Sequence, residues 1–318
     1  MVVGNLKIAE NSFTLMKRKV IQIANSTQLI SLPRKWCIEH GIKKGDELEV
    51  EEQGNKIRVS TSKEEALETA KIHFSGVDSF LRRPFITFYK LGYDELEISF
   101  DDPKIIPKIQ EEIGELMGFE IVNQTERTCT VRNVASAMDT EFDSILRRIM
   151  LMLIEMARDT SEALSKRKFS ALEEIAKRER LNNKLTIFCE RILNKKGYKD
   201  HRRLSFIYYI VCNLEHLADD VADIGIYCHR HEPKLNPTTL KLVKELSTLI
   251  EQVYDLFYKS SIEGIYAFKK RHSQLERQGT ELLRSVPKES IPVMHSLLMA
   301  AEKLRHMSAY CINKSTTA

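Results

Sequence analysis

The sequence predicts a multidomain α+β protein made of successive segments. Short apolar and polar alternations, typical of strands, fill residues 1–62, whereas residues 63–137 mix strand and helix patterns. From residue 138 onward the apolar residues recur with the helical period. A chain of 318 residues is also long for one hydrophobic core, so two or three domains are expected.

The first segment combines four strand patterns with one short helix. The helix is predicted within PRKWCIEHGIKKGD (33–46), where Pro33 suits its first turn and Gly41 its C-terminal end. Gly54-Asn55 predicts a hairpin between the last two strands, because both residues tolerate positive φ. The strand patterns are VIQIA (20–24), LISLP (29–33), ELEVEE (47–52) and KIRVS (56–60).

The middle segment predicts a small α+β unit. A helix is expected over 103–117, closed by Gly118, and residues 63–74 predict a short helix or the approach to a strand. No residue of this segment indicates a ligand. Strands are expected at FITFYK (85–90), ELEISF (95–100), FEIVNQ (119–124) and TCTVRN (128–133).

The C-terminal half predicts a tandem repeat of three helices. FSALEEIAKRERLNNKL (169–185) resembles YAFKKRHSQLERQGTEL (266–282), and CNLEHLADDVADIGIY (212–227) resembles LMAAEKLRHMSAYCI (298–312). We therefore expect an all-α pair of three-helix bundles, over 138–232 and 233–318. The helices are predicted at about 138–167, 170–196, 200–230, 237–262, 264–284 and 288–315.

An acidic stripe, defined by Glu215, Asp219 and Asp223, lies along one of these helices. The spacing i, i+4, i+8 places the three carboxylates on one face, where like charges repel by a few tenths of a kcal/mol per pair. A divalent or trivalent metal ion, with His216 and Asp220 extending its site, would offset this repulsion. The alternative is a solvated face opposite Lys or Arg. In the second repeat the corresponding residues are Glu302, His306 and Tyr310.

The repeated helices, each set ending in such a stripe, resemble the PhoU family of phosphate-uptake regulators over about residues 140–315. That family carries an E/D-x-x-x-D motif in each repeat, and the motif binds metal ions. Glu215 and Asp219 match it in the first repeat, and Asp223 stands where the family often has Asn. In the second repeat Glu302 matches, but His306 replaces the Asp. The resemblance thus implies metal ligands at Glu215, Asp219 and Asp223, and a weaker site at Glu302 and His306.

The segment 17–60 resembles the AbrB/MazE/SpoVT swapped-hairpin module, through ANSTQLISLP (24–33) and GIKKGDELEV (41–50). Two copies of that module interlace into a dimeric β-barrel that binds DNA, and fusions to PhoU-like domains of the archaeal type are known. The resemblance implies phosphate contacts from basic residues and base or sugar contacts from the polar turn. These expected DNA-binding residues are Lys17, Arg18, Lys19, Asn25, Ser26, Thr27, Gln28, Arg34 and Lys35.

Charge and composition agree with a local anionic partner. The net charge is +4, yet Lys7, Lys17, Arg18, Lys19, Arg34 and Lys35 face a single acid, Glu10, in the first 35 residues. ELEVEE would repel DNA, so any footprint is one-sided. An alternative is that these basic side chains only solvate a dimer edge.

Several protein classes find no support in the sequence. It contains no phosphate loop, dinucleotide fingerprint, G-x-S-x-G elbow or HExxH motif, so we expect a protein that is not an enzyme. The six cysteines form no CxxC pair, which predicts reduced, mostly buried thiols in a cytoplasmic protein. Neither a signal peptide nor a membrane-inserted segment is expected.

Two functions follow from these observations. The first is a DNA-binding transcriptional regulator of phosphate uptake, whose helical bundles bind metal. The second is an adaptor that dimerises through its N-terminal module and docks on a phosphate transporter subunit or a signalling enzyme without binding DNA.

Overall fold

The computed structural model describes residues 16–23, 27–53, 56–61, 67–76, 81–134 and 141–311. The chain divides into two compact units, Met1–Leu67 and Glu68–Ala318. The predicted boundaries at residues 137 and 232 both fall within the second unit. No helix in the described part of the chain has the length and apolar character needed to cross a membrane.

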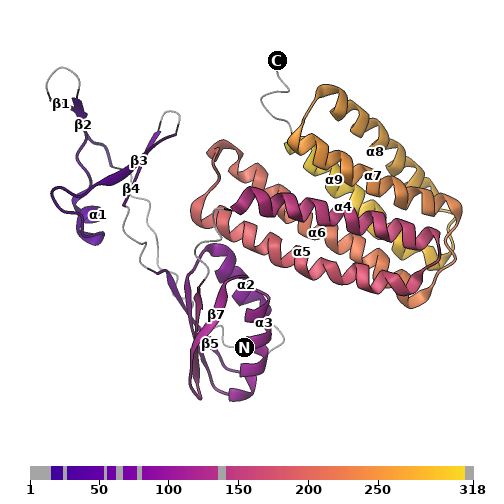
Figure 1. Ribbon diagram of the computed structural model, residues 1–318, viewed down its shortest axis with the longest axis horizontal. Coiled ribbons are helices and arrows are strands. Elements are labelled where there is room, and N and C mark those ends of the chain that lie inside the picture. Colours follow the sequence, from indigo (N-terminus) through magenta and orange to yellow (C-terminus); the bar gives the residue numbers. More distant parts are fainter. Residues whose placement is uncertain are drawn as a thin grey trace. The chain divides into compact units, whose positions relative to one another are not determined.

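The N-terminal unit contains two hairpins and one short helix (Figure 1). Strands β1 (Ile21–Ile23) and β2 (Thr27–Leu29) pair antiparallel, as do β3 (Leu48–Gln53) and β4 (Lys56–Thr61). Helix α1 (Arg34–Glu39) lies between the hairpins in sequence. Gly41, two residues after its end and with φ of 59°, confirms the predicted stop. The pairing of Gln53 with Lys56 confirms the second hairpin, although its turn residues Gly54 and Asn55 lie outside the described residues.

The described strands of this unit form two separate two-stranded sheets and no closed barrel. None of the described residues between 16 and 61 is buried. The barrel predicted from the resemblance is therefore not made within one chain. Four short strands bury too little apolar surface to form a stable core alone.

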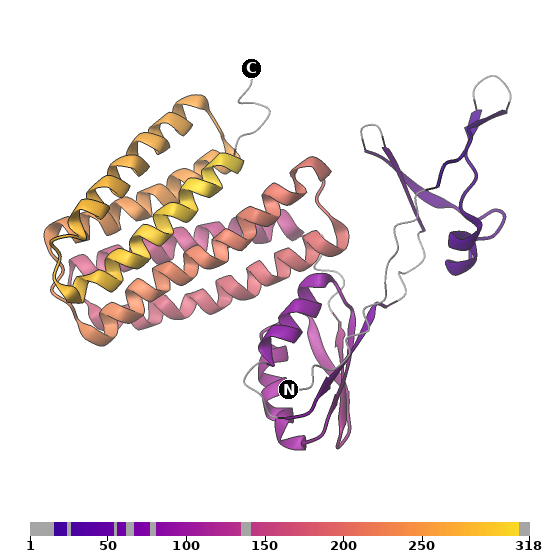
Figure 2. The ribbon, with the colours of Figure 1, turned by 180° about the vertical axis from the view of Figure 1, so that it is seen from behind.

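The second unit begins with a four-stranded sheet. Strand β5 (Thr69–Phe74) pairs parallel with β6 (Glu95–Phe100), and β8 (Thr128–Asn133) pairs antiparallel with both β6 and β7 (Phe119–Gln124). Helices α2 (Arg82–Leu91) and α3 (Ile106–Gly114) lie on one face of this sheet (Figure 1 and Figure 2). The predicted strands at 95–100, 119–124 and 128–133 are confirmed. Strand β5 occupies the second half of residues 63–74, where a short helix or the approach to a strand was predicted.

The predicted strand at FITFYK is wrong, because these residues belong to α2. Phe85, Phe88 and Tyr89 are buried at i, i+3 and i+4, which is helical spacing, and Gly92, with φ of 99°, ends the helix. Six apolar-rich residues are too short a run to distinguish the two periods. The next helix also differs, since residues 103–105 form a 3₁₀ turn and α3 ends at Gly114, before the predicted stop at Gly118.

Six long helices complete the second unit and confirm the predicted helical half. Asn236 and Ser261 accept hydrogen bonds from the first turns of the helices that follow them, which fixes two of the helix starts. A 3₁₀ turn precedes α6 and another precedes α9. The helices are α4 (Phe142–Ser165), α5 (Phe169–Lys196), α6 (Leu204–His231), α7 (Pro237–Tyr258), α8 (Ile262–Leu282) and α9 (Ile291–Tyr310).

The two predicted three-helix sets pack into one bundle. Helices α4, α5 and α6 contact one another, and α8 packs against α7 and α9. Extensive α6–α9 and α4–α7 contacts join the two sets, so that all six helices share one hydrophobic core. The helical half is therefore a single packed body, and α5 and α6 form the pair that carries the acidic stripe.

Candidate functional site

The acidic stripe of α6 faces α5 and the end of α2. At one end of the stripe, Lys90 of α2 places its Nζ 2.6 Å from Oε2 of Glu190 and 3.6 Å from Oε2 of Glu215. The Glu190 side chain is only 1% exposed. Burial disfavours the charge on Lys90, but the hydrogen bond to Glu190 and the charges of Glu190 and Glu215 outweigh it and raise the pKa of Lys90. The sequence had left open whether a Lys or Arg lies opposite the stripe. Lys90 is such a partner for Glu215.

At the next turn of the stripe, Asp219 meets two side chains of α5. The side-chain amide of Asn183 donates to Glu179 and lies 3.4 Å from Oδ1 of Asp219. Burial, the charge of Asp219 and a hydrogen bond with it raise the pKa of Glu179 to about 7. The charges of Arg82 and Arg180 offset part of this rise, so the Glu179 carboxyl has basic as well as acidic neighbours.

Asn183 gives an independent indication about this cluster. Its Oδ1 is buried without a hydrogen-bond donor among the described residues, although a half-turn of the amide exchanges the oxygen and the nitrogen. Carboxylate and amide oxygens are the ligands that hard divalent cations prefer. A cavity of about 170 Å³, lined by Glu179 and Asn183 and by Arg82 of α2, opens beside the cluster. Glu179, Asn183 and Asp219 thus bring together the oxygen atoms that a cation would need, but Arg180 and Lys184 line the same cavity as Arg82.

The other residues of the predicted metal site lie apart from this cluster. No group of three or more His, Cys, Asp or Glu side chains suited to a metal ion occurs among the described residues. Asp220 is held by Lys303 of α9 at 2.6 Å, His216 is exposed, and Glu215 contacts Lys90. The Asp223 side chain is largely exposed. Its partial burial and the charge of Asp219 raise its pKa. Of the predicted first-repeat ligands, Asp219 alone lies in the three-residue cluster.

The corresponding residues of the second repeat do not gather in the same way. Glu302 lies 3.6 Å from both Arg305 and His306, so its carboxylate already contacts a guanidinium on its own helix. His272 of α8 is buried and contacts the carbonyl oxygen of Ala301. A metal ion at Glu302 and His306 stays a prediction that no feature of α8 strengthens.

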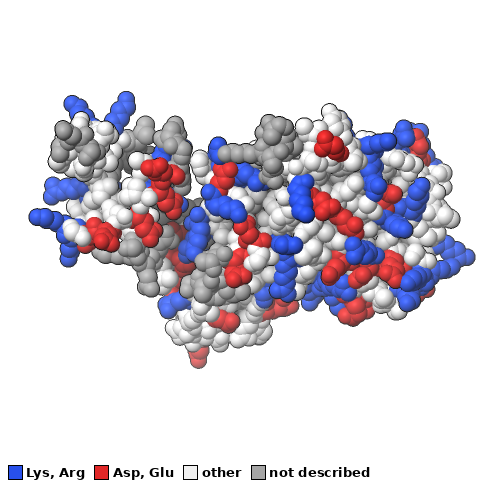
Figure 3. All heavy atoms as spheres, turned by 45° about the horizontal axis from the view of Figure 1, so that its top comes forward, with Lys and Arg blue, Asp and Glu red and all other residues white. Residues whose placement is uncertain are grey.

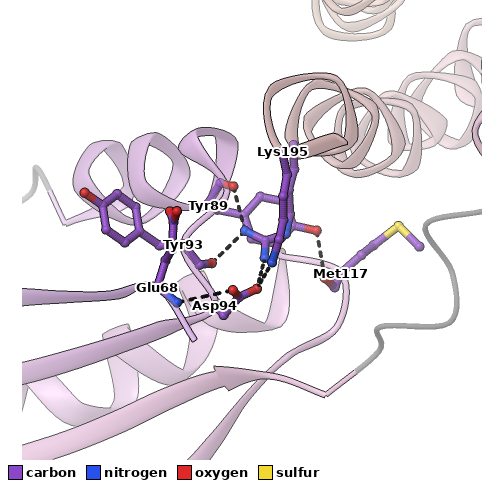
Figure 4. Close-up of polar contacts among 7 residues, drawn as sticks. Glu68, Tyr89, Tyr93, Asp94, Met117 and Lys195 are labelled. Carbon is purple, nitrogen blue, oxygen red and sulfur yellow. Dashed lines mark hydrogen bonds and ion pairs between the residues drawn. The ribbon is translucent and has the colours of Figure 1, made fainter. Parts of the chain in front are cut away.

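The middle segment is fastened to the bundle beside the Lys90 end of the stripe. Arg191 of α5, 2% exposed, donates to the carbonyl oxygens of Tyr89 and Tyr93 at 3.0 and 2.6 Å and to Asp94 at 2.9 Å. Lys195 also contacts Asp94, whose other oxygen accepts a bond from the Glu68 amide (Figure 4). Sheet and helices are thereby joined through a buried ion-pair contact.

The predicted DNA-binding residues that the structure describes are exposed. Lys17, Arg18 and Lys19 precede β1 instead of lying on it, because β1 begins at Ile21. Thr27 and Gln28 belong to β2 and not to the turn. Asn25 and Ser26 lie outside the described residues. Arg34 and Lys35 open α1, as predicted.

The surface charge of the second unit differs from that basic stretch. On the face seen in Figure 3, acidic and basic side chains of the bundle are interspersed and form no large field of one sign. Such a mixed surface does not attract a polyanion strongly. This face therefore offers a polyanion no extended basic patch.

Three residues of the stripe's surroundings escaped sequence reasoning. Glu179 and Asn183 had a signal, since they lie at i and i+4 on the helix before the stripe. No sequence signal pointed to Lys90, because the prediction placed this residue in the strand FITFYK. The α2 helix, which only its burial pattern reveals, brings Lys90 to the stripe.

Comparison with known proteins identifies the N-terminal module. Residues 21–66 match the family described as antidote-toxin recognition MazE, bacterial antitoxin. The N-terminal module is similar to this family. This match confirms the N-terminal part of the resemblance and covers both hairpins and α1. No curated protein and no solved structure matches the chain. The PhoU resemblance of the helical half stays a prediction.

Proposed function

We propose that the protein is a DNA-binding transcriptional regulator of phosphate uptake whose helical bundle binds a metal ion. The observation that carries the proposal is the MazE-like module at residues 21–66, joined to exposed basic residues on both sides of its first hairpin. The phosphate role rests on the PhoU resemblance, and the metal on the Glu179–Asn183–Asp219 cluster. A cation there would supply positive charge between α5 and α6.

The deciding experiment is DNA selection with the purified full-length protein. Fragmented genomic DNA is incubated with the protein at physiological salt, and the retained fragments are sequenced. Enrichment of a few promoters near phosphate-transport genes is the expected result. If all DNA fragments are retained equally and lost at higher salt, or if no fragment is retained, the protein is not a promoter-specific regulator.

The basic side chains before β1 should act through phosphate contacts. Replacing Lys17, Arg18 and Lys19 with alanine is expected to lower the slope of log affinity against log salt by about three units, because each phosphate contact releases about one counterion. Fluorescence anisotropy over a salt series measures this slope. The matched triple variant Lys43→Ala, Lys44→Ala and Lys56→Ala removes the same charge elsewhere in the unit, and an equal loss there would contradict the assignment.

The cation cluster should depend on Asp219 more than on the rest of the stripe. Losing even a partner of a direct ligand lowers metal affinity about 10–100-fold, so Asp219→Asn is expected to weaken Mn²⁺ binding at least as much. Isothermal titration calorimetry measures it. Glu251→Gln, which changes an exposed carboxylate paired with Arg158, is the control, and a loss there as large as at Asp219 would contradict this assignment of the site.

An adaptor is the second candidate function. It is favoured by the matched family itself, which is described by recognition of a toxin, hence of a protein. In this case the N-terminal module dimerises, and the bundle docks on a phosphate transporter subunit or signalling enzyme. Affinity capture with and without added metal distinguishes the two, because the adaptor predicts retention of a transport ATPase by a protein that selects no promoter.

A further inference from the structure

A polar groove of about 340 Å³ lies between α7 and α8. The two helices are antiparallel neighbours in the bundle (Figure 1 and Figure 2). The residues that line the groove recur at helical spacings, so each helix contributes one face to it. Ala267 of α8 contributes only a methyl group, so a larger side chain there would fill part of the space. No residue of the acidic stripe or of the middle segment lines this groove.

The charge of the groove is mainly positive. Lys241 of α7 and Lys270 and Arg271 of α8 face the single carboxylate of Glu245. Arg271 places its Nε 3.8 Å from Oε2 of Glu245, whereas Lys241 and Lys270 form no ion pair among the described residues. Two ammonium groups are therefore available to an acidic partner.

The groove also offers hydrogen-bonding atoms that lack partners. Oε2 of Glu245 and Oε1 of Gln252 are buried, and neither accepts a hydrogen bond from the described residues. Both side chains are partly exposed, so a small rotation brings either oxygen to a donor in the groove. Gln274 and Gln278, one helical turn apart on α8, add amide donors and acceptors. A ligand with its own N–H groups would satisfy these atoms.

The matching ligand combines carboxylates with N–H donors. An acidic peptide has both, because its side chains pair with the lysines and its main chain exchanges hydrogen bonds with the amides and Glu245. The phosphates of a nucleic acid or a polyphosphate would instead meet the Glu245 charge. The α8 part of the lining, residues 267–278, is about 16 Å long, which accommodates about five residues of extended chain.

We propose that the groove between α7 and α8 binds an acidic peptide segment of a partner protein. The peptide lies extended, with its carboxylates on Lys241 and Lys270 and its main chain along the glutamine amides. The inference depends neither on DNA binding nor on a metal ion, since the residues proposed for those roles do not line the groove. It gives the helical half a protein-binding surface under either proposed function.

The first test probes a peptide array with the purified full-length protein. The array holds heptapeptides blocked at both ends, in which Glu or Asp alternates with Ser, together with matched sets that carry Gln or Lys in place of the acids. Retention on the acidic sets alone is expected, and it should weaken as salt is raised. Equal retention on all sets, or none on the acidic ones, would overturn the inference.

The second test places the binding in the groove, by fluorescence anisotropy with the acidic peptide that is retained most strongly. Lys241→Gln/Lys270→Gln is expected to lower its affinity at least about tenfold, because both carboxylate partners are removed. Ala267→Leu should lower it by a similar factor without a change of charge, because the side chain fills the groove.

Matched variants outside the groove serve as controls. Lys244→Gln/Lys269→Gln removes the same charge from the same two helices, and Ser273→Leu adds the same side chain to an exposed position of α8. Both should leave the affinity within about twofold. Circular dichroism checks that every variant is folded.

Two further outcomes would overturn the inference. If both lysine variants lose affinity equally and Ala267→Leu has no effect, the peptide is attracted by net charge and not by the groove. If inorganic polyphosphate binds more tightly than the peptide and is also excluded by Ala267→Leu, the groove is a polyanion site and not a peptide site.

Discussion

Replacing Arg191 with alanine is expected to lower the free energy of unfolding of the second unit by about 3–5 kcal/mol. The guanidinium is buried and bonds two carbonyl oxygens and the Asp94 carboxylate, and it lies 5.0 and 5.4 Å from the ring centres of Tyr89 and Phe119. Its removal leaves these acceptors buried, and Asp94 retains only Lys195 and the Glu68 amide. Unpaired buried charge is the costly part of the change.

Far-UV circular dichroism during chemical denaturation measures this change. The helical signal reports on the second unit, whereas Trp36, the single tryptophan of the sequence, lies in the first unit and serves as an internal reference. Arg158→Ala is the control, because the Arg158–Glu251 pair at 2.8 Å is exposed and such pairs contribute little.

A second variant tests the reason given for the loss. Arg191→Met/Asp94→Asn removes both charges, so it should be more stable than Arg191→Ala by a measurable part of the loss. If the double variant instead loses as much free energy of unfolding as Arg191→Met and Asp94→Asn lose together, packing and not the buried charge decides the stability of this junction.

The elements that could be predicted are those with long, regular patterns. Six helices of 20 residues or more repeat the helical period often enough to be recognised. The first hairpin is indicated by its strand patterns, and the second also by the turn residues Gly54 and Asn55. FITFYK failed because its six residues fit both periods. Only the packing of Phe85, Phe88 and Tyr89 under the sheet decides between them.

The candidate site also depends on tertiary contacts that a sequence pattern does not contain. A single helix predicts which carboxylates share a face, and the Glu215, Asp219 and Asp223 stripe was found in this way. It does not predict what lies opposite. Glu179, Asn183 and Lys90 come from other elements, and their tertiary contacts divide the stripe between an ammonium partner and a carboxyl pair.

The N-terminal unit should be a homodimer, because one chain leaves its apolar faces uncovered. In the second hairpin Val50 pairs with Val59 and Glu52 with Ile57, so that apolar side chains gather on one face. Val50 is 61% and Ile57 67% exposed. The other face carries Glu49, Glu51, Arg58 and Ser60. An amphipathic hairpin of this kind is stable only when a second apolar surface covers it.

Ile57→Lys is therefore expected to raise the dimer dissociation constant at least about 100-fold. Covering an isoleucine contributes about 1.5–3 kcal/mol, and removing an ammonium from water costs more than its pairing with Glu52 across the hairpin returns. About 2.7 kcal/mol already corresponds to two decades in the constant. Sedimentation equilibrium over a concentration series measures the change, and affinity for a selected promoter should fall with it.

Ser60→Lys is the matched control, since it adds the same charge to the same strand on the polar face. It should leave the dimer intact. A wild-type protein that is monomeric at about 10 μM, or equal dissociation of both variants, would contradict a dimer built on this face. Because residues 16–61 contain no buried residue among those described, a monomeric unit would also have to be mostly unfolded. Circular dichroism of the isolated unit separates a folded monomer from that outcome.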